Sequence, residues 1–353
     1  MATVASMPTL LVIPTGIGCA VGGYAGDALP AARLLAAASG CLVTHPNVMN
    51  GAALYWSDPR IHYVEGYSLD RFAAGELHLK PVRQQRVGLL LDAGIEPELR
   101  QRHLQVADAC RATLGLNIGP VVTTDVPLEV SLSLGASGVS WGQLRRPDAL
   151  LRAGEQLKAS GATAIAVVAR FPDDPDSQAL ASYRQGSGVD ALAGAEAVIS
   201  HLLSRELGLP CAHAPALSPL PLDPDLDPRA AAEELGFSFL PCVLVGLSRA
   251  PDLLPAGVAL TADQATLAID AVGAVIAPAA ALGGAAVLAS AERGIPVIAV
   301  DNPCLLNVTA EALGLDVLPA ASFSEAAGLV LALREGIAPA ALRRPLFSLS
   351  RLP

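Results

Sequence analysis

Two histidines stand where a strand is expected to end, and each has polar neighbours. His45 is followed by Asn47 and Asn50, and His213 follows Cys211 in the run Cys-Ala-His-Ala-Pro. An imidazole exchanges protons near neutral pH, and amide side chains supply fixed hydrogen bonds beside it. We therefore expect His45 and His213 to transfer protons and the two asparagines to bind substrate. A turn held by its asparagines is the alternative at His45.

Metal coordination is not expected at either histidine. Cys211 and His213 share one face of a strand, but no second pair at zinc-ligand spacing accompanies them. The pair supplies at most two ligands where a catalytic zinc needs three. Asp173 and Asp174 suit either Mg²⁺ or a solvated turn, and the sequence leaves both open. No cofactor is assigned.

Further polar groups follow other expected strands. Asp301 and Asn302 follow one strand, and Arg170 closes another. Ser248 and Arg249 follow a third. Because the carboxyl ends of parallel strands meet at one edge of a sheet, we expect Asp301 to be catalytic and Asn302 and Ser248 to contact substrate. Arg170 or Arg249 would hold a substrate anion through its guanidinium.

Two glycine-rich turns precede expected helices. One contains Gly16 and Gly18 within residues 16–26, and the other is Gly283-Gly284. Glycines let backbone N–H groups approach an anion at an electropositive helix N-terminus. We expect both turns to bind one shared phosphate or carboxylate. The first turn only approximates a dinucleotide fingerprint, because no acidic residue follows the second strand where a ribose contact belongs.

Short apolar runs alternate with helix-period stretches, which is the pattern of buried parallel strands and covering helices. The expected strands are 10–14, 41–45, 87–91, 121–124, 164–169, 211–214, 242–246, 274–277 and 296–300. The expected helices are 29–38, 97–114, 148–160, 192–207, 284–293 and 308–313. Asp27 and Asp148 stand at N-cap positions of two of these helices.

The fold class that this alternation predicts is α/β. A (β/α)₈ barrel also fits, but the proline- and aspartate-rich stretch 218–228 is typical of a linker. We therefore expect two Rossmann-like lobes with mainly parallel sheets and a cleft between them. The predicted division is an N-terminal lobe over 1–217, a linker over 218–235 and a C-terminal lobe over 236–353.

The charge of the chain bears on its partners. The net charge is −10 over 353 residues, and such a field repels nucleic acid and anionic lipid surfaces. No nucleic acid or membrane partner is therefore expected, and a homo-oligomer is left open. Residues 271–291 are uncharged and long enough to span a membrane, but Pro278 and Gly283-Gly284 interrupt them. A strand, a turn and a helix are expected there.

The cysteines and the N-terminal stretch indicate a cytoplasmic location. Six scattered cysteines lack any Cys-x-x-Cys pair, which favours a reducing compartment. Residues 1–26 carry no charge and lack the basic start of a signal peptide. Gly16 lies three residues before Cys19, at the position where a lipoprotein signal would carry leucine.

Six longer motifs resemble a family of uncharacterised proteins from cyanobacteria and plant plastids. The motifs are Ile-Pro-Thr-Gly-Ile-Gly from Ile13, Gly-Gly-Tyr-Ala-Gly-Asp-Ala from Gly22, Thr-His-Pro-Asn-Val from Thr44, Ala-Arg-Phe-Pro-Asp-Asp from Ala169, Leu-Pro-Cys-Ala-His-Ala-Pro-Ala from Leu209 and Val-Gly-Leu-Ser-Arg-Ala-Pro from Val245. The resemblance spans nearly the whole chain. It implies a cyanobacterial or plastid metabolic setting and no particular activity.

A second, local resemblance concerns residues 274–300. This segment is similar to the donor-binding unit of GT-B glycosyltransferases, with a strand, a small-residue turn, a helix carrying Glu292 and the run Gly-Ile-Pro-Val-Ile. It covers one βαβ unit. It implies a nucleotide-activated donor near Gly283, Gly284 and Glu292.

Three functions follow from these observations. The leading hypothesis is a cytosolic enzyme that acts on a small anionic metabolite by histidine-mediated acid–base chemistry, with the strand-end residues lining one cleft. The second is a GT-B-like transferase. The third is a non-catalytic protein that binds a metabolite in the same cleft.

Overall fold

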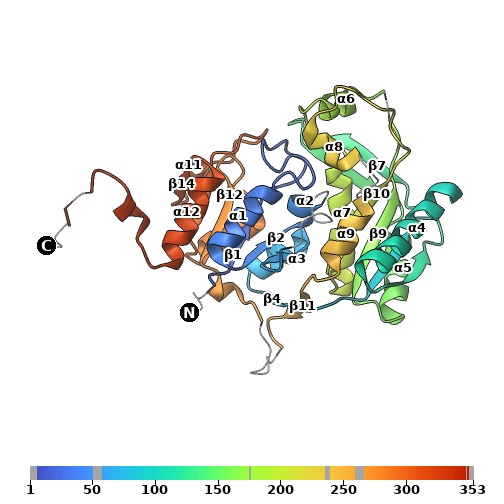
Figure 1. The fold of residues 1–353 in the computed structure, drawn as a ribbon, viewed down its shortest axis with the longest axis horizontal. Helices are drawn as coiled ribbons and strands as arrows, with labels where there is room; N and C mark the ends of the chain where they lie inside the picture. The colour runs from blue at the N-terminus through green and yellow to red at the C-terminus, as the bar shows by residue number, and fades with distance from the viewer. Residues whose placement is uncertain are drawn as a thin grey trace.

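The computed structural model of the chain contains two parallel sheets, each in its own lobe (Figure 1). It describes residues 6–50, 58–174, 176–234, 239–258, 266–346 and 348–349. The blue and the orange-to-red parts of the chain form one lobe together, and the part coloured from teal through green to gold forms the other. The predicted α/β class with two Rossmann-like lobes is confirmed.

The first lobe is built on a six-stranded sheet whose neighbouring strands all pair in parallel. In spatial order its strands are β14 (Leu318–Ala320), β13 (Val297–Val300), β12 (Ala274–Pro278), β1 (Thr9–Leu11), β2 (Leu42–Thr44) and β3 (Ile61–Tyr63). From the centre of the sheet, β1, β2 and β3 follow one another outward on one side, and β12, β13 and β14 do so on the other. This is the order of the doubly wound dinucleotide-binding fold, with its switch point between β1 and β12.

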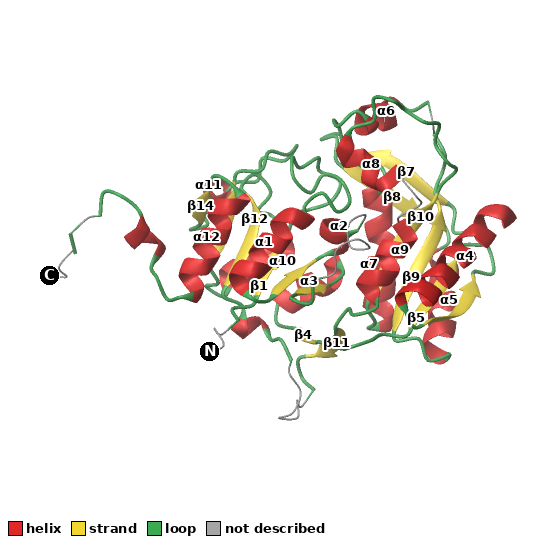
Figure 2. Cartoon of the chain, in the orientation of Figure 1, coloured by secondary structure: helices red, strands yellow, loops and turns green. Residues whose placement is uncertain are grey.

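Helices cover both faces of this sheet (Figure 2). Side chains alternate along β1, so Leu11 packs with α1 (Leu29–Ser39) and α12 (Phe323–Arg334). Leu10 instead joins the core under α3 (Gly66–Ala73) and α10 (Ala285–Glu292). Because both faces are buried, the strands are largely apolar, as the sequence pattern indicated.

The second lobe is built on a four-stranded parallel sheet. Its strands lie in the order β10 (Cys211–Ala216), β9 (Ala164–Arg170), β5 (Val87–Leu91) and β6 (Ile118–Thr123). One face packs against α5 (Pro147–Ala159) and α7 (Ala193–Leu207). The other packs against α4 (Pro97–Leu114) and α9 (Phe239–Leu247). Gly115 and Gly208 end α4 and α7 in the left-handed conformation, which glycine adopts most readily.

Smaller elements join the lobes or extend from them. The antiparallel pair β4 (Leu77–Lys80) and β11 (Asp252–Pro255) lies where the chain leaves the first lobe and returns to it. The hairpin β7 (Val130–Leu134) and β8 (Ser140–Leu144) packs on α7. The remaining short elements are α2 (Pro46–Met49), α6 (Gln178–Arg184), α8 (Pro228–Glu234), α11 (Ala310–Leu313), η2 (Ile269–Ala271) and η3 (Pro339–Leu342).

The sheets do not divide the chain at the predicted boundaries of 217 and 236. Strands β1–β3 share their sheet with β12–β14, although the predicted division put them in different lobes. The second sheet lies wholly within the predicted N-terminal lobe. The predicted linker 218–235 contains α8, which packs against α6. The second lobe is therefore an insertion within the first.

One predicted strand, 242–246, is wrong. These residues belong to α9, whose side chains are buried almost all round because the helix lies between the two lobes. A helix that is buried on every side has no polar face, so a short apolar run cannot distinguish it from a buried strand.

The predicted strand, turn and helix over 271–291 are confirmed as β12, a glycine turn and α10. Within the described residues, no single helix has the length and apolar character to cross a membrane. The bent pair α8 and α9 meets that test only when both helices are taken together, with 81° between them.

Candidate functional site

A cavity of about 550 Å³ lies between the lobes. The first lobe lines it with the start of α2 and the N-terminus of α3, and the second with α7, β10 and the hairpin strand β7. Its volume is in the range of small-molecule sites. Four of the predicted site residues line it, namely His45, Asn47, Asn50 and His213.

His213 projects from β10 toward α7 and contacts two polar side chains of that helix. Its Nδ1 lies 2.5 Å from Oγ of Ser200, and its Nε2 lies 3.5 Å from Oε2 of Glu196. The Ser200 hydroxyl also donates to the backbone carbonyl of Glu196, one turn earlier. All three side chains line the cavity, and only 13% of the His213 side chain is exposed. This arrangement fixes the imidazole ring and leaves a carboxylate near Nε2.

His45 has a different environment, although it also lines the cavity. It is buried before α2, and its Nε2 accepts a hydrogen bond of 3.1 Å from the backbone N–H of Ile13. Burial lowers the pKa of His45 to about 4, so its ring is neutral near pH 7. Because Nε2 is occupied as an acceptor, the single proton of the ring is on Nδ1.

The two asparagines near His45 bond to the chain itself. Nδ2 of Asn47 donates to the carbonyl of Gly22, and Oδ1 of Asn50 accepts from the hydroxyl of Tyr63. These bonds hold α2 against the loop that follows β1 and against β3.

Carboxylates dominate the charge of the cavity lining. Glu65 is paired with His201 at 2.9 Å across the two lobes, and Glu196 faces His213. Burial opposes protonation of His201, but the hydrogen bond to Glu65 and nearby negative charge together raise its pKa. Arg102 also lines the cavity and pairs at 3.9 Å with Glu98 on its own helix.

Asp190 and Glu233 line the same cavity, and neither forms an ion pair within the described part of the chain. Glu233 accepts from the Tyr183 hydroxyl and the backbone N–H of Ala25, and Asp190 accepts from the backbone N–H of Leu192. Burial, followed by the charge of Glu196, raises the pKa of Asp190 to about 7. Burial and the charge of Asp190 raise the pKa of Glu233 well above its usual range.

The glycine loop (residues 16–26) does not present a row of vacant amides. The backbone N–H of Gly22 donates to Oδ1 of Asp27 at 2.6 Å, and that of Val21 donates to Oδ1 of Asn302 at 2.9 Å. Asp27 also pairs with Arg229 at 2.7 Å, and it precedes the N-cap of α1 instead of occupying it. Groups of the chain thus take the positions that an anion was expected to take.

Gly16 and Gly18 in this loop have positive φ, but neither lines the cavity. The carbonyl of Gly16 accepts from the backbone N–H of Ser140, which ties the glycine loop to the β7–β8 hairpin. Gly18 lies against Gly188, where a Cβ would approach the carbonyl oxygen to 3.0 Å. Both glycines therefore serve the close packing of the two lobes.

The Gly283-Gly284 turn lies away from the cavity, at the N-terminus of α10. Oδ1 of Asp70 on α3 accepts from the backbone N–H of Ala286 there at 3.0 Å. A carboxylate of the chain again holds the helix N-terminus. The two glycine turns do not converge on a shared anion, and Glu292 lies at the far end of the helix from its N-terminus.

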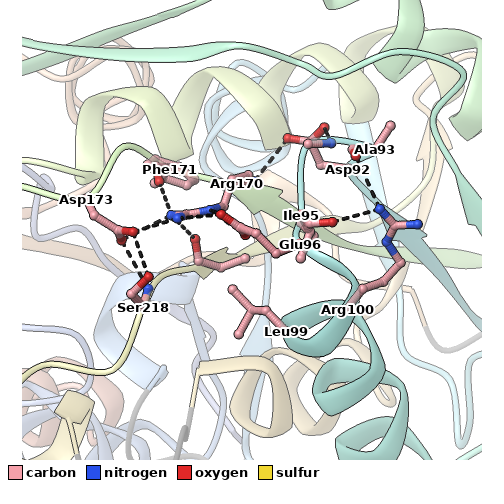
Figure 3. Close-up of polar contacts among 12 residues, drawn as sticks. Asp92, Ala93, Ile95, Glu96, Leu99, Arg100, Arg170, Phe171, Asp173 and Ser218 are labelled. Carbon is pink, nitrogen blue, oxygen red and sulfur yellow. Dashed lines mark hydrogen bonds and ion pairs between the residues drawn. The ribbon is translucent and has the colours of Figure 1, made fainter.

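Arg170 is committed to an ion-pair network at the end of β9 (Figure 3). Its guanidinium pairs with Glu96 at 2.9 Å and with Asp173 at 2.5 Å. Asp173 also accepts from the backbone N–H and the hydroxyl of Ser218. Hydrogen bonding to Arg170 lowers the pKa of Asp173. Figure 3 shows the guanidinium between the two carboxylates, where it joins α4, β9 and the segment after β10.

The other predicted strand-end residues also lie outside the cavity lining. Asp301 is exposed beyond β13, and Asn302 is buried with its amide bonded to both backbone groups of Val21. Ser248 and Arg249 follow the helix α9 instead of a strand; Ser248 is buried and bonded to Val245, and Arg249 is exposed. Only some of the strand-end residues that were expected to share one cleft therefore line this cavity.

Sequence reasoning missed the residues around His213. Glu196 and Ser200 are four apart on one helix, and Asp190 precedes that helix. Polar residues with helical spacing on an otherwise buried helix were the available signal. Among the residues that the structure describes, no group of three or more His, Cys, Asp or Glu side chains is arranged to hold a metal ion.

The fold and this geometry define a two-lobed α/β protein with a doubly wound sheet and an acidic cavity between its lobes. Residues 8–343 match the family described as "Protein of unknown function (DUF3326)", and the chain belongs to that family. A protein of Synechococcus sp. (strain ATCC 27144 / PCC 6301 / SAUG 1402/1), named an uncharacterized lipoprotein, is 57% identical over 338 residues. The match covers 96% of this chain and 93% of the relative. No solved structure matches the chain.

Proposed function

We propose that this protein is an enzyme that transfers protons to and from a small molecule bound between its lobes, with His213 as the catalytic group. The observation that carries the proposal is the contact of His213 with Ser200 and Glu196 on the cavity wall. A buried imidazole held by a hydroxyl and faced by a carboxylate has the composition of a general acid–base site.

We infer the tautomer of His213 from the hydrogen bonds around Ser200. Because the Ser200 hydroxyl donates to the carbonyl of Glu196, its lone pairs face Nδ1 of His213. The neutral ring then carries its proton on Nδ1 and presents the Nε2 lone pair as the base. A proton taken from substrate at Nε2 forms an imidazolium, which the nearby Glu196 carboxylate stabilises. His45, with its proton on Nδ1, acts as a neutral hydrogen-bond donor.

The cavity lining favours a different ligand charge from the one expected from the sequence. The carboxylates of Glu65, Asp190, Glu196 and Glu233 line it. Arg170, which was expected to hold an anion, is paired with Glu96 and Asp173 instead. A neutral or cationic ligand is therefore favoured over a small anion.

The proposal is tested with a metabolite extract from a cyanobacterium. Wild-type protein and the His213→Gln variant are incubated separately with the extract, and the small molecules are compared by mass spectrometry. We expect the wild type to convert at least one metabolite and the variant to convert it about 10²- to 10⁴-fold more slowly, the usual contribution of a general acid–base residue.

The matched control is His62→Gln, since His62 lies on β3 outside the cavity lining. This variant should retain wild-type turnover and bind the converted metabolite as the wild type does. Equal turnover by the wild type and His213→Gln, with both proteins folded, would contradict the role of His213.

We also propose that the protein works in the cytoplasm, although the Synechococcus relative is named a lipoprotein. Cys19 is 1% exposed and follows β1, which lies between β12 and β2. Cleavage before Cys19 for lipid attachment would remove this central strand. All six cysteines are free, which suits a reducing compartment. N-terminal sequencing of the natural protein should recover residues that precede Cys19.

A further inference from the structure

The balance of charge on the cavity wall suggests which ligands the cavity selects. Glu65 is matched by His201, Glu196 faces His213, and Asp173 is matched by Arg170. Glu234 is paired with Arg184 at 2.7 Å. The exposed Asp174 aside, Asp190 and Glu233 are the lining carboxylates without a cationic partner in the described part of the chain.

These two carboxylates are held in place by hydrogen bonds. Glu233 is 9% exposed and is fixed by Tyr183 and the backbone of Ala25, and Asp190 is fixed by the backbone of Leu192. Burying a carboxylate without a counter-charge is costly, and two close to each other also repel. Since no described residue forms an ion pair with either, the cavity itself is where a compensating charge can enter.

We infer that the cavity selects a small molecule carrying an ammonium group, and that Asp190 and Glu233 are its specificity-determining residues. This inference rests on the proposed function and names its substrate class. Apolar residues such as Val189, Leu192 and Phe239 line the cavity as well, and they provide surface for the carbon skeleton of such a ligand. The net charge of −10 also attracts cations toward the protein.

Proton linkage predicts the direction in which ligand binding depends on pH. The groups facing the two carboxylates are Glu196 on α7, His213 on β10, and the stacked rings of Tyr183 and Tyr24, 4.2 Å apart. Arg229, on the same helix as Glu233, is engaged by Asp27. A bound ammonium favours the ionised carboxylates, so its binding should release protons near pH 6.5 and tighten as the pH rises toward 8. Binding of an anion would take up protons instead.

The probes are three commercial amines, each with an analogue that lacks the charge. Glucosamine is compared with glucose, 1,4-diaminobutane with 1,4-butanediol, and ethylamine with ethanol, all at one ionic strength and pH 6.5. Succinate and Mg²⁺ are added as the opposite charge and as a competing cation. Thermal shift and calorimetry measure binding to the wild type, to Asp190→Asn/Glu233→Gln and to Asp176→Asn. Asp176 is an exposed carboxylate outside the cavity lining, so its variant is the matched control.

At least one amine should raise the melting temperature of the wild type and of Asp176→Asn by several degrees, with proton release, while its uncharged analogue does not. The double variant should bind that amine at least tenfold more weakly. A larger response to succinate or to Mg²⁺, proton uptake on binding, or equal amine affinity of the double variant would overturn the inference. So would the absence of a response to every amine.

The His213→Gln variant separates this inference from the proposed function. Amine binding that survives in His213→Gln supports the ligand class whether or not the protein is catalytic. If that variant also converts the metabolite as fast as the wild type does, the proposed function fails and the ligand class stands. If the metabolite converted by the wild type carries no amine, the ligand class fails and the role of His213 stands.

Discussion

Two regions that border the cavity use polar side chains in opposite ways. In the glycine loop, Asp27 and Asn302 are bonded to backbone amides of the loop, and Asp27 is also paired with Arg229. On the wall formed by β10 and α7, His213 and Glu196 face the cavity with hydrogen-bonding capacity left over. Buried polar groups are almost always satisfied, and the difference lies in whether the chain or a ligand satisfies them.

The largest expected effect contrasts a carboxylate from each region. Asp27→Ala removes the partner of both Arg229 and the Gly22 amide, and only 13% of the Asp27 side chain is exposed. We expect it to lower the free energy of unfolding by about 2–4 kcal/mol. Glu196→Gln should change that free energy by less than about 1 kcal/mol, because its partner His213 lies 3.5 Å away.

Urea denaturation of the two variants measures this difference. Similar losses of stability in both would remove the distinction between the two regions. A turnover assay sharpens the contrast, because Glu196→Gln should slow turnover while Asp27→Ala should leave it intact per folded molecule.

A second prediction concerns His45 and pH. Its pKa is lowered to about 4 by burial, so the unfolded chain binds a proton between pH 6.5 and 4 where the folded chain does not. The stability contributed by neutral His45 is therefore lost as the pH falls through this window, by about 3 kcal/mol in all. Urea denaturation at pH 7 and pH 4.5 should show a smaller pH dependence for His45→Gln than for the wild type. An unchanged dependence would show that His45 is charged or exposed.

The smallest effect is expected at Arg249. This residue is exposed after α9, although the sequence pattern placed it at a strand end facing substrate. Arg249→Ala should change the free energy of unfolding by less than about 0.5 kcal/mol and leave ligand binding unchanged. A tenfold loss of ligand affinity in a binding assay would show that Arg249 belongs to the binding site.

The alternation of strands and helices could be predicted because both sheets are covered on two faces and their strands are therefore largely apolar. The prediction failed at α9 for the same reason, since a helix buried between two lobes is as apolar as a strand. Of the site, His45 and His213 were found from their positions after apolar runs. Asp190 and Glu233 were not, because they lie 43 positions apart in the sequence, before α7 and on α8, and only the folded chain brings both to one cavity.

Lobe membership could not be predicted because it depends on pairing between distant strands. The composition of the Ser-Pro-Leu-Pro stretch at 218–221 predicts a lobe boundary there. In the structure β1 pairs directly with β12, although the whole second lobe lies between these two strands in the sequence. Local composition carries no information on such pairing.

The central position of β1 also affects the order in which the protein is made. Thr9 pairs with Leu42 on one side and with Ala274 on the other, so one edge of β1 has no partner until the ribosome has synthesised the entire second lobe. At about 5–20 residues per second this interval lasts roughly 10–50 s. During it the nascent chain carries an apolar, unpaired strand edge, which is the kind of surface that chaperones protect. The second lobe, whose four strands are contiguous in synthesis, can complete its sheet first.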